Sequence, residues 1–107
     1  MHWADALLLA WLATLFYRGD LMDIQAVLMD RANLSVREGQ ILALICEGMT
    51  DKGIARHLAI SLGTVHAHIE HLYLKMGVQS ESINVRCAAI SNAVLRGMVT
   101  LSWRRNA

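Results

Sequence analysis

The first part of the chain is dominated by apolar residues that recur at helical spacing. Between residues 4 and 17 the one charged residue is Asp5. A helix that is apolar on most of its circumference is stable only where most of that circumference is covered. The pattern therefore predicts a helix that is buried in the protein or against a partner, with large apolar side chains at four-residue steps and beside them: Trp3, Leu7, Trp11, Leu15 and Phe16.

A second, shorter apolar pattern follows a break at Gly19 and Asp20. Glycine commonly ends a helix and aspartate commonly caps the next one. We expect residues 1–33 to form an apolar prefix of one or two helices, closed by a linker at residues 31–33. The apolar positions that predict the second helix are Leu21, Ile24, Val27 and Leu28.

Residues 34–99 show four further helical segments, each bounded by capping residues. Ser35 and Glu38 form the S-x-x-E pattern of a capping box, which fixes the start of the first segment. The remaining boundaries are expected at Thr50 or Asp51, at Ile60–Ser61 and at Ser80 or Ser82 for helix starts, and near Gly48, Gly77 and Gly97 for helix ends.

The inward faces of these four segments predict one core, and the fold class is all-α. The chain has no proline, so nothing prevents long helices, and hydrophobic residues make up 55% of it. The residues expected to face the core are Ile41, Leu42, Leu44, Ile45, Ile54, Ala55, Leu58, Val65, Ile69, Leu72, Met76, Val85, Ala88, Ala89 and Val94.

The second and third of these segments are joined by a turn of three residues around Ala59–Ser61. A short helix, a tight turn and a longer helix make a helix-turn-helix. The turn sets the third segment across the second, so that its N-terminal half projects and is free to enter a DNA groove.

Four stretches of this region, LSVRE, GMTDKGIARHLAIS, GTVHAHI and LKMGV, stand in a characteristic order and spacing. From about Leu34 to Val99 the chain resembles the DNA-binding domain of LuxR-type (FixJ/NarL-type) bacterial transcription regulators. The residues that fit the family pattern are Arg37, Glu38, Gly48, Lys52, Ile54, Ala55, Leu58, Ser61, Thr64, Val65, His68, Lys75, Gly77 and Val78.

The resemblance implies a four-helix domain that docks its third helix in the major groove of double-stranded DNA, often as a homodimer through its fourth helix. Carried over position by position, two sets of DNA contacts follow. The positions that would face base edges are His66, Ala67 and Glu70, and those that would hold the DNA backbone are Lys52, Ser61, Thr64 and Lys75.

The low net charge of residues 34–99 argues against strong DNA binding. Residues 34–99 hold six Lys or Arg and five Asp or Glu, a net charge of +1, whereas counterion release usually supplies much of a protein's affinity for DNA. His66 replaces an expected lysine, Glu70 stands where a basic or polar residue is frequent, and Glu81 lies near the place of an expected arginine. An interaction protein that keeps the fold but binds DNA weakly, or not at all, and modulates another regulator is therefore the alternative.

Other chemistry has little support in the sequence. His68 and His71 share a helix face, but only Glu70 could join them at a metal, so we expect no metal site. No nucleophile turn or paired carboxylates point to an enzyme, and no cofactor is implied. Cys46 and Cys87 are expected to be buried, reduced thiols.

The prefix and the tail complete the prediction. We expect residues 1–33 to drive oligomerisation or partner docking, because a small domain cannot easily bury such an apolar helix. Residues 100–107 are expected to form a frayed basic tail. A membrane anchor at residues 4–17 is the weaker alternative, since that stretch is shorter than the roughly 20 residues that a bilayer needs. Taken together, these patterns predict a cytoplasmic regulator without a sensory domain of its own.

Overall fold

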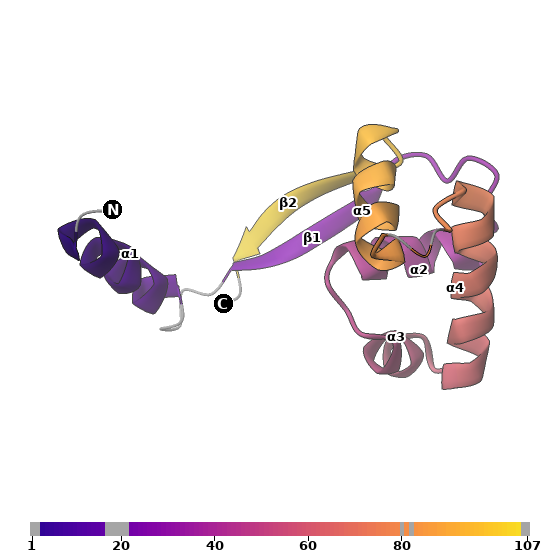
Figure 1. Cartoon of the computed structure of the whole chain (residues 1–107). Coiled ribbons are helices and arrows are strands. Elements are labelled where there is room, and N and C mark those ends of the chain that lie inside the picture. The colour runs from indigo at the N-terminus through magenta and orange to yellow at the C-terminus, as the bar shows by residue number, and fades with distance from the viewer. Residues whose placement is uncertain (1–2, 17–21, 80, 82, 106–107) are drawn as a thin grey trace.

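The structure is a computed structural model of the 107-residue chain, and it describes residues 3–16, 22–79, 81 and 83–105. Four helices pack into a body, from which a two-stranded ribbon extends toward a separate N-terminal helix (Figure 1). In chain order the elements are α1 (Trp3–Phe16), β1 (Met22–Leu28), α2 (Val36–Cys46), α3 (Asp51–Leu58), α4 (Leu62–Met76), α5 (Val85–Leu95) and β2 (Val99–Arg105).

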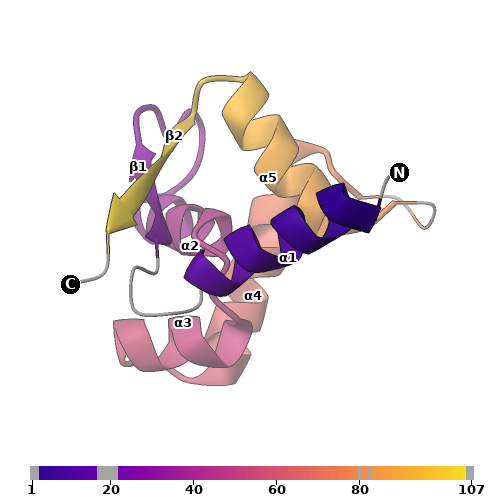
Figure 2. The same ribbon diagram turned by 90° about the vertical axis from the view of Figure 1, so that its left-hand side faces the viewer.

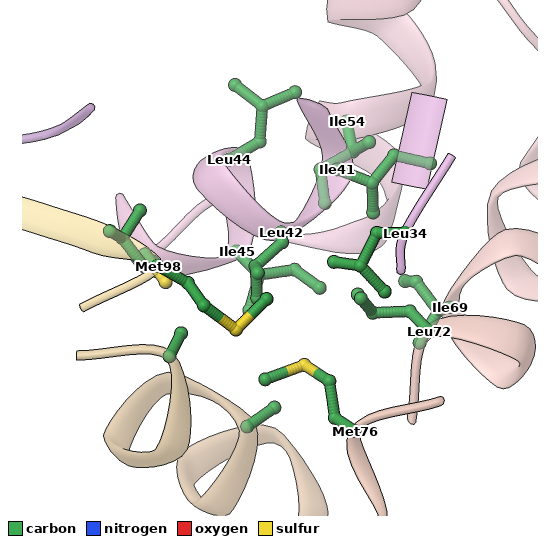
Figure 3. Close-up of a cluster of buried hydrophobic side chains, with 14 of the residues drawn as sticks. Leu34, Ile41, Leu42, Leu44, Ile45, Ile54, Ile69, Leu72, Met76 and Met98 are labelled. Carbon is green, nitrogen blue, oxygen red and sulfur yellow. The ribbon is translucent and has the colours of Figure 1, made fainter. Parts of the chain in front are cut away.

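The core lies between α2, α4 and α5, with α3 closing one end (Figure 2). Figure 3 shows side chains of α2 and α4 converging with Leu34 and Met98. Leu34 lies just before α2 in the chain, and Met98 lies just after α5. Most residues predicted to face inward are buried, and the best covered large ones are Ile41, Leu42, Ile45, Ile54, Val65 and Leu72. The described residues are thus mostly helical, but the two-stranded sheet of β1 and β2 shows that the predicted all-α fold class was wrong.

Local capping explains where most helices begin. The Ser35 hydroxyl accepts from the Glu38 N–H at 3.1 Å, and the Glu38 carboxylate accepts from the Ser35 N–H at 2.7 Å, so the predicted capping box is confirmed. Thr50 rather than Asp51 caps α3, and Ser61 caps α4. Gly77 ends α4 with φ +69°, a conformation that glycine adopts without strain.

The last helix begins later than predicted. Ser80 and Ser82 lie outside the described residues, and the N-cap is Asn84, whose side chain accepts from the Cys87 N–H at 3.1 Å. Asn84 caps as well as serine because its amide oxygen reaches the same orphan donors. The burial of Val94 and Cys87 was also predicted wrongly: Val94 is 42% exposed and the Cys87 side chain faces solvent.

The second prefix helix was predicted wrongly, because Met22–Leu28 is a strand. β1 pairs antiparallel with β2, from Met22 opposite Arg105 to Leu28 opposite Val99. The segment fits a strand through its alternate apolar positions, and a partner some 75 residues away decides between the two structures. The tail predicted as frayed is that partner. Of the second-helix positions, Leu21 lies outside the described residues.

The ribbon is fastened to the body at its inner end. The Ala26 N–H donates to Oε2 of Glu47 at 3.0 Å, and the Met29 N–H donates to the Met98 carbonyl at 2.7 Å. Met98 and Val99 are buried in the core, whereas Trp103, near the outer end, is 67% exposed. The ribbon therefore belongs to the body at one end and leaves its apolar side chains uncovered at the other.

Helix α1 lies beyond the outer end of the ribbon and makes no extensive contact with another described element (Figure 1). Its residues 4–10 are exposed, and Leu7 is 60% exposed. The predicted helix is present, but its residues 4–10 are not buried within the chain, and the side chains of Trp3, Trp11, Leu15 and Phe16 are outside what the structure describes. Among the described residues, no helix has both the length and the apolar character to cross a membrane.

Candidate nucleic-acid interface

The helix-turn-helix consists of α3, the turn at residues 59–61 and α4. Ala59 ends α3 in the left-handed conformation, with φ +56°, and the Ile60 N–H returns to the Ala55 carbonyl at 3.0 Å. Ser61 then starts α4 at once. The sharp reversal lets α4 cross α3 against the core and leaves its N-terminal half at the edge of the body (Figure 1).

One face of α4 is buried and the opposite face is uncovered. Val65, Ile69, Leu72 and Met76 form the buried face, as predicted. The outer face, which we call the reading face, comprises exposed residues at helical spacing. Its members are Gly63, Thr64, His66, Ala67, Glu70, His71 and Leu74, which include all three positions predicted to face base edges.

Polar groups predicted to hold the DNA backbone stand at the start of this face. The Ser61 hydroxyl accepts from the Thr64 N–H at 3.1 Å and lies 2.8 Å from the Thr64 hydroxyl. Both side chains are exposed, and Lys52 is exposed on α3. The N-terminus of α4, with its partial positive charge, thus lies beside two hydroxyls.

Lys75 has a different environment from the other predicted contacts. Its ammonium lies 2.7 Å from Oε1 of Glu38, a side chain that is only 4% exposed. Burial raises the pKa of the Glu38 carboxyl, but hydrogen bonds from Lys75 and the Ser35 backbone outweigh it and lower that pKa to about 2. The pair ties the C-terminal turn of α4 to the start of α2.

Sequence reasoning missed Arg86, which joins α5 to the helix-turn-helix. Its Nη1 lies 2.7 Å from Oδ1 of Asp51, and its Nη2 donates to the Met49 carbonyl. Only Glu81, near the place of the expected arginine, was considered from the sequence, and not this arginine of α5. Because Arg86 lies on α5 and Asp51 on α3, their contact depends on how the two helices are placed in the fold.

A depression of about 530 Å³ lies where these elements meet. It is lined by Asp51 and Lys52 of α3, Leu62 and His66 of α4, and Arg86 of α5. Nε2 of His66 lies 3.2 Å from Oδ2 of Asp51. The depression therefore joins the reading face to the start of α3.

The thiol of Cys46 is buried on α2 and is not part of the reading face. Burial and the neighbouring Glu47 carboxylate raise the pKa of the Cys46 thiol to about 11, so this thiol stays protonated and unreactive. In the part of the chain that the structure describes, no group of three His, Cys, Asp or Glu side chains is placed to hold a metal ion.

The fold of this chain is similar to that of a solved response regulator. The chain is similar to the response regulator ChrA of a haem-sensing two-component system, with a TM-score of 0.55 and 37% identity. The similarity covers 64% of this chain and 31% of that one.

Comparison with other sequences points to the same group of proteins. The chain is 43% identical over 51 residues to the nitrate/nitrite response regulator NarL of Escherichia coli, and 46% identical over 48 residues to the oxygen regulatory protein NreC of Staphylococcus aureus. These stretches cover 48% and 45% of this chain, but only 24% and 22% of the relatives. Residues 32–88, more than half of the chain, match the family of bacterial regulatory proteins named luxR. The chain belongs to the LuxR family of helix-turn-helix transcription regulators.

Proposed function

We propose that this chain is a sequence-specific DNA-binding regulator that acts as a dimer with α4 in the major groove. The observation that carries the proposal is the uncovered reading face, held out by a helix whose opposite face is buried in the core. A major groove of B-DNA is wide enough to admit one helix. A bacterial regulator of this kind works in the cytoplasm, where the chromosome lies.

In this proposal the reading face supplies the base contacts. Glu70 is suited to accept from the amino group of cytosine, and the Ala67 methyl to pack on a thymine methyl. His66 offers ring nitrogens to a base edge. Lys52, Ser61 and Thr64 hold phosphates beside them, with the hydroxyls and the helix N-terminus as donors.

Lys75 has a smaller part in DNA contact than the resemblance implies. Its side chain is 38% exposed, but its ammonium pairs with Glu38. If the Lys75 ammonium moved from Glu38 to a phosphate, the buried carboxylate would be left without its cation, which is costly in free energy. We propose that Lys75 mainly orients α4.

The number of available cations sets the expected salt dependence. Lys52 and Arg56 are exposed on α3, and neither has an ion-pair partner among the described residues. Two such cations per subunit predict a slope of log K against log salt of about −4 for a dimer. This is a modest electrostatic contribution, so specific contacts on the reading face have to supply much of the affinity.

Selection of duplexes from a random pool, followed by a salt titration of the selected duplex, tests the proposal. We expect a preferred sequence with two half-sites. The slope of log K against log salt should be less steep by about 2 in the dimer of the Lys52→Ala variant. Arg96→Ala is the matched control, because it removes an exposed cation from the end of α5 distant from α3 (Figure 1). No selected sequence would contradict sequence-specific DNA binding, and binding insensitive to salt would contradict the proposed phosphate contacts.

The second candidate function is an interaction protein that modulates another regulator. It is favoured by α1, whose Leu7, Leu8 and Leu9 are each more than half exposed, and by the acidic Glu70 on the reading face. Under this proposal the chain binds duplex DNA weakly or not at all but forms a stable complex with a full-length LuxR-type regulator.

We also propose that α1 associates with a second copy through its large apolar residues, Trp3, Leu7, Trp11, Leu15 and Phe16. Sedimentation of the Leu7→Asp variant tests this, and a shift toward monomer is expected because a charge cannot be buried in an apolar interface. Leu95→Asp is the comparison, since Leu95 is 87% exposed at the end of α5. Dissociation by the second change alone would assign the dimer to α5.

A further inference from the structure

Arg86 of α5 contacts the start of α3 at two points. Its Nη1 donates to Oδ1 of Asp51 at 2.7 Å, and its Nη2 donates to the Met49 carbonyl. Thr50 is the N-cap of α3, so Met49 lies just before the cap and Asp51 just after it. One guanidinium therefore spans the beginning of the helix, with the planar fork of donors that distinguishes arginine from lysine.

The position of Arg86 is not favoured by its own helix. Arg86 stands in the first turn of α5, two residues after the cap Asn84. The N-terminus of a helix carries partial positive charge, so a cation is unfavourable there, whereas Asp51 is favourable in the first turn of α3. The contacts that stabilise the Arg86 side chain are therefore those with α3 and the turn before it.

The start of α3 depends on support from outside the helix. α3 has 8 residues, and an isolated helix shorter than about 12 residues is marginal in water. Gly53 stands in its first turn, and glycine is a poor helix former. The Thr50 hydroxyl accepts from the Gly53 N–H at 3.1 Å and supplies the local support. Arg86 supplies a second support from another part of the chain.

Lys52 lies within the turn that Arg86 supports. It stands between Asp51 and Gly53, its side chain is exposed, and it lines the same depression as Arg86. The Arg86 side chain is 34% exposed and its charge is paired with Asp51, whereas Lys52 has no ion-pair partner among the described residues. Of these two cations, Lys52 is the one available to a phosphate.

We propose that Arg86 is a positioning residue for DNA binding: it fixes the first turn of α3, so that Lys52 meets a phosphate of the duplex. This inference rests on the proposed function and adds to it a residue of α5 that acts through Lys52. The contacts of Arg86 exist in the free chain, so their effect is measurable both without DNA and with it.

Hydrogen exchange of the free chain is the first measurement. Arg86→Lys keeps the charge beside Asp51 but loses the fork of donors. Exchange at the Gly53 amide should become about fivefold faster, because the first turn of α3 opens more often. The Thr64 amide, which donates to the cap of α4, should keep its rate.

The matched control is Arg96→Lys, the same change at the exposed C-cap of α5. It should leave exchange at the Gly53 amide as in the wild type. Equal rates at Gly53 in the wild type and both variants would overturn the inference without bearing on whether the chain binds DNA.

A salt titration of the duplex selected by the wild type is the second measurement. In Arg86→Lys the slope of log K against log salt should be less steep by up to about 2 for a dimer, although the number of cations is unchanged. Arg96→Lys should keep the wild-type slope. An unchanged slope in Arg86→Lys would overturn the inference.

The Lys52→Ala background separates positioning from direct contact. There Arg86→Lys and Arg86→Gln should not change the slope further, because Lys52 is the group through which Arg86 acts. A further decrease in Arg86→Gln would mean that Arg86 itself meets a phosphate, and would overturn the inference alone. No DNA binding by the wild type would overturn the proposed function and the inference together.

Discussion

The helical body and the N-terminal helix place the same residue type in opposite environments. Leu42 and Leu72 are fully buried between α2 and α4, whereas Leu7, Leu8 and Leu9 of α1 are 55–60% exposed. The body covers its own apolar surface, so it has what a stable domain needs. The apolar surface of α1 is left for something outside the single chain, which we propose is a second copy.

The largest expected difference between the two regions is in the cost of losing a leucine. Leu72→Ala should lower the free energy of unfolding by about 3 kcal/mol, because it leaves a cavity in the core. Leu8→Ala, at a 55% exposed position, should cost less than about 0.5 kcal/mol in the monomer. Urea unfolding at low protein concentration measures both, and similar losses would show that α1 is part of the same core.

Acid should act on the body through Glu38. Its pKa is about 2 in the folded chain and ordinarily 4.5, so the carboxylate stabilises the fold above about pH 4.5. That contribution, about 3 kcal/mol, should be lost as the pH falls toward 2. Glu38→Gln should remove most of this pH dependence.

The control for the acid experiment is Glu81→Gln, which changes an exposed carboxyl in the loop before α5. Unfolding free energies at pH 7, 4 and 2.5 should be the same for this variant and the wild type. If Glu38→Gln keeps the full pH dependence, the buried pair with Lys75 is not its source.

The body was predictable because its signals are local. The capping box at Ser35, the cap at Ser61 and the left-handed Gly77 each act within a few residues of where they stand, and the buried face of α4 follows from its own spacing. The start of α5 was missed because Asn84 caps as well as the serines that precede it. The predicted and the observed start of α5 differ by only a few residues.

The ribbon could not be predicted in this way. Met22–Leu28 has apolar residues that suit either a helix or a strand, and its partner lies at the other end of the chain. The site divides similarly: exposure of His66, Ala67 and Glu70 follows from helix geometry, but the links from Asp51 to Arg86 and from Lys75 to Glu38 depend on how separate helices pack.

A smaller effect should distinguish the two ends of the ribbon. Glu47→Ala removes the carboxylate that accepts from the Ala26 N–H, so it should destabilise the inner end by about 1 kcal/mol. Hydrogen exchange at the Ala26 amide should become about fivefold faster. Trp103→Ala, at the exposed outer end, should leave that exchange rate unchanged, and an equal acceleration would mean that the ribbon opens as one unit.

The central claim, that the outer face of α4 reads DNA, is tested most directly at Glu70. Duplex selection with the wild type and with Glu70→Gln should give sites that differ at one base pair per half-site, where the wild type prefers cytosine by about fivefold. The exposed Glu81→Gln should select the wild-type site. Identical sites from all three chains, or no selected site at all, would contradict the account.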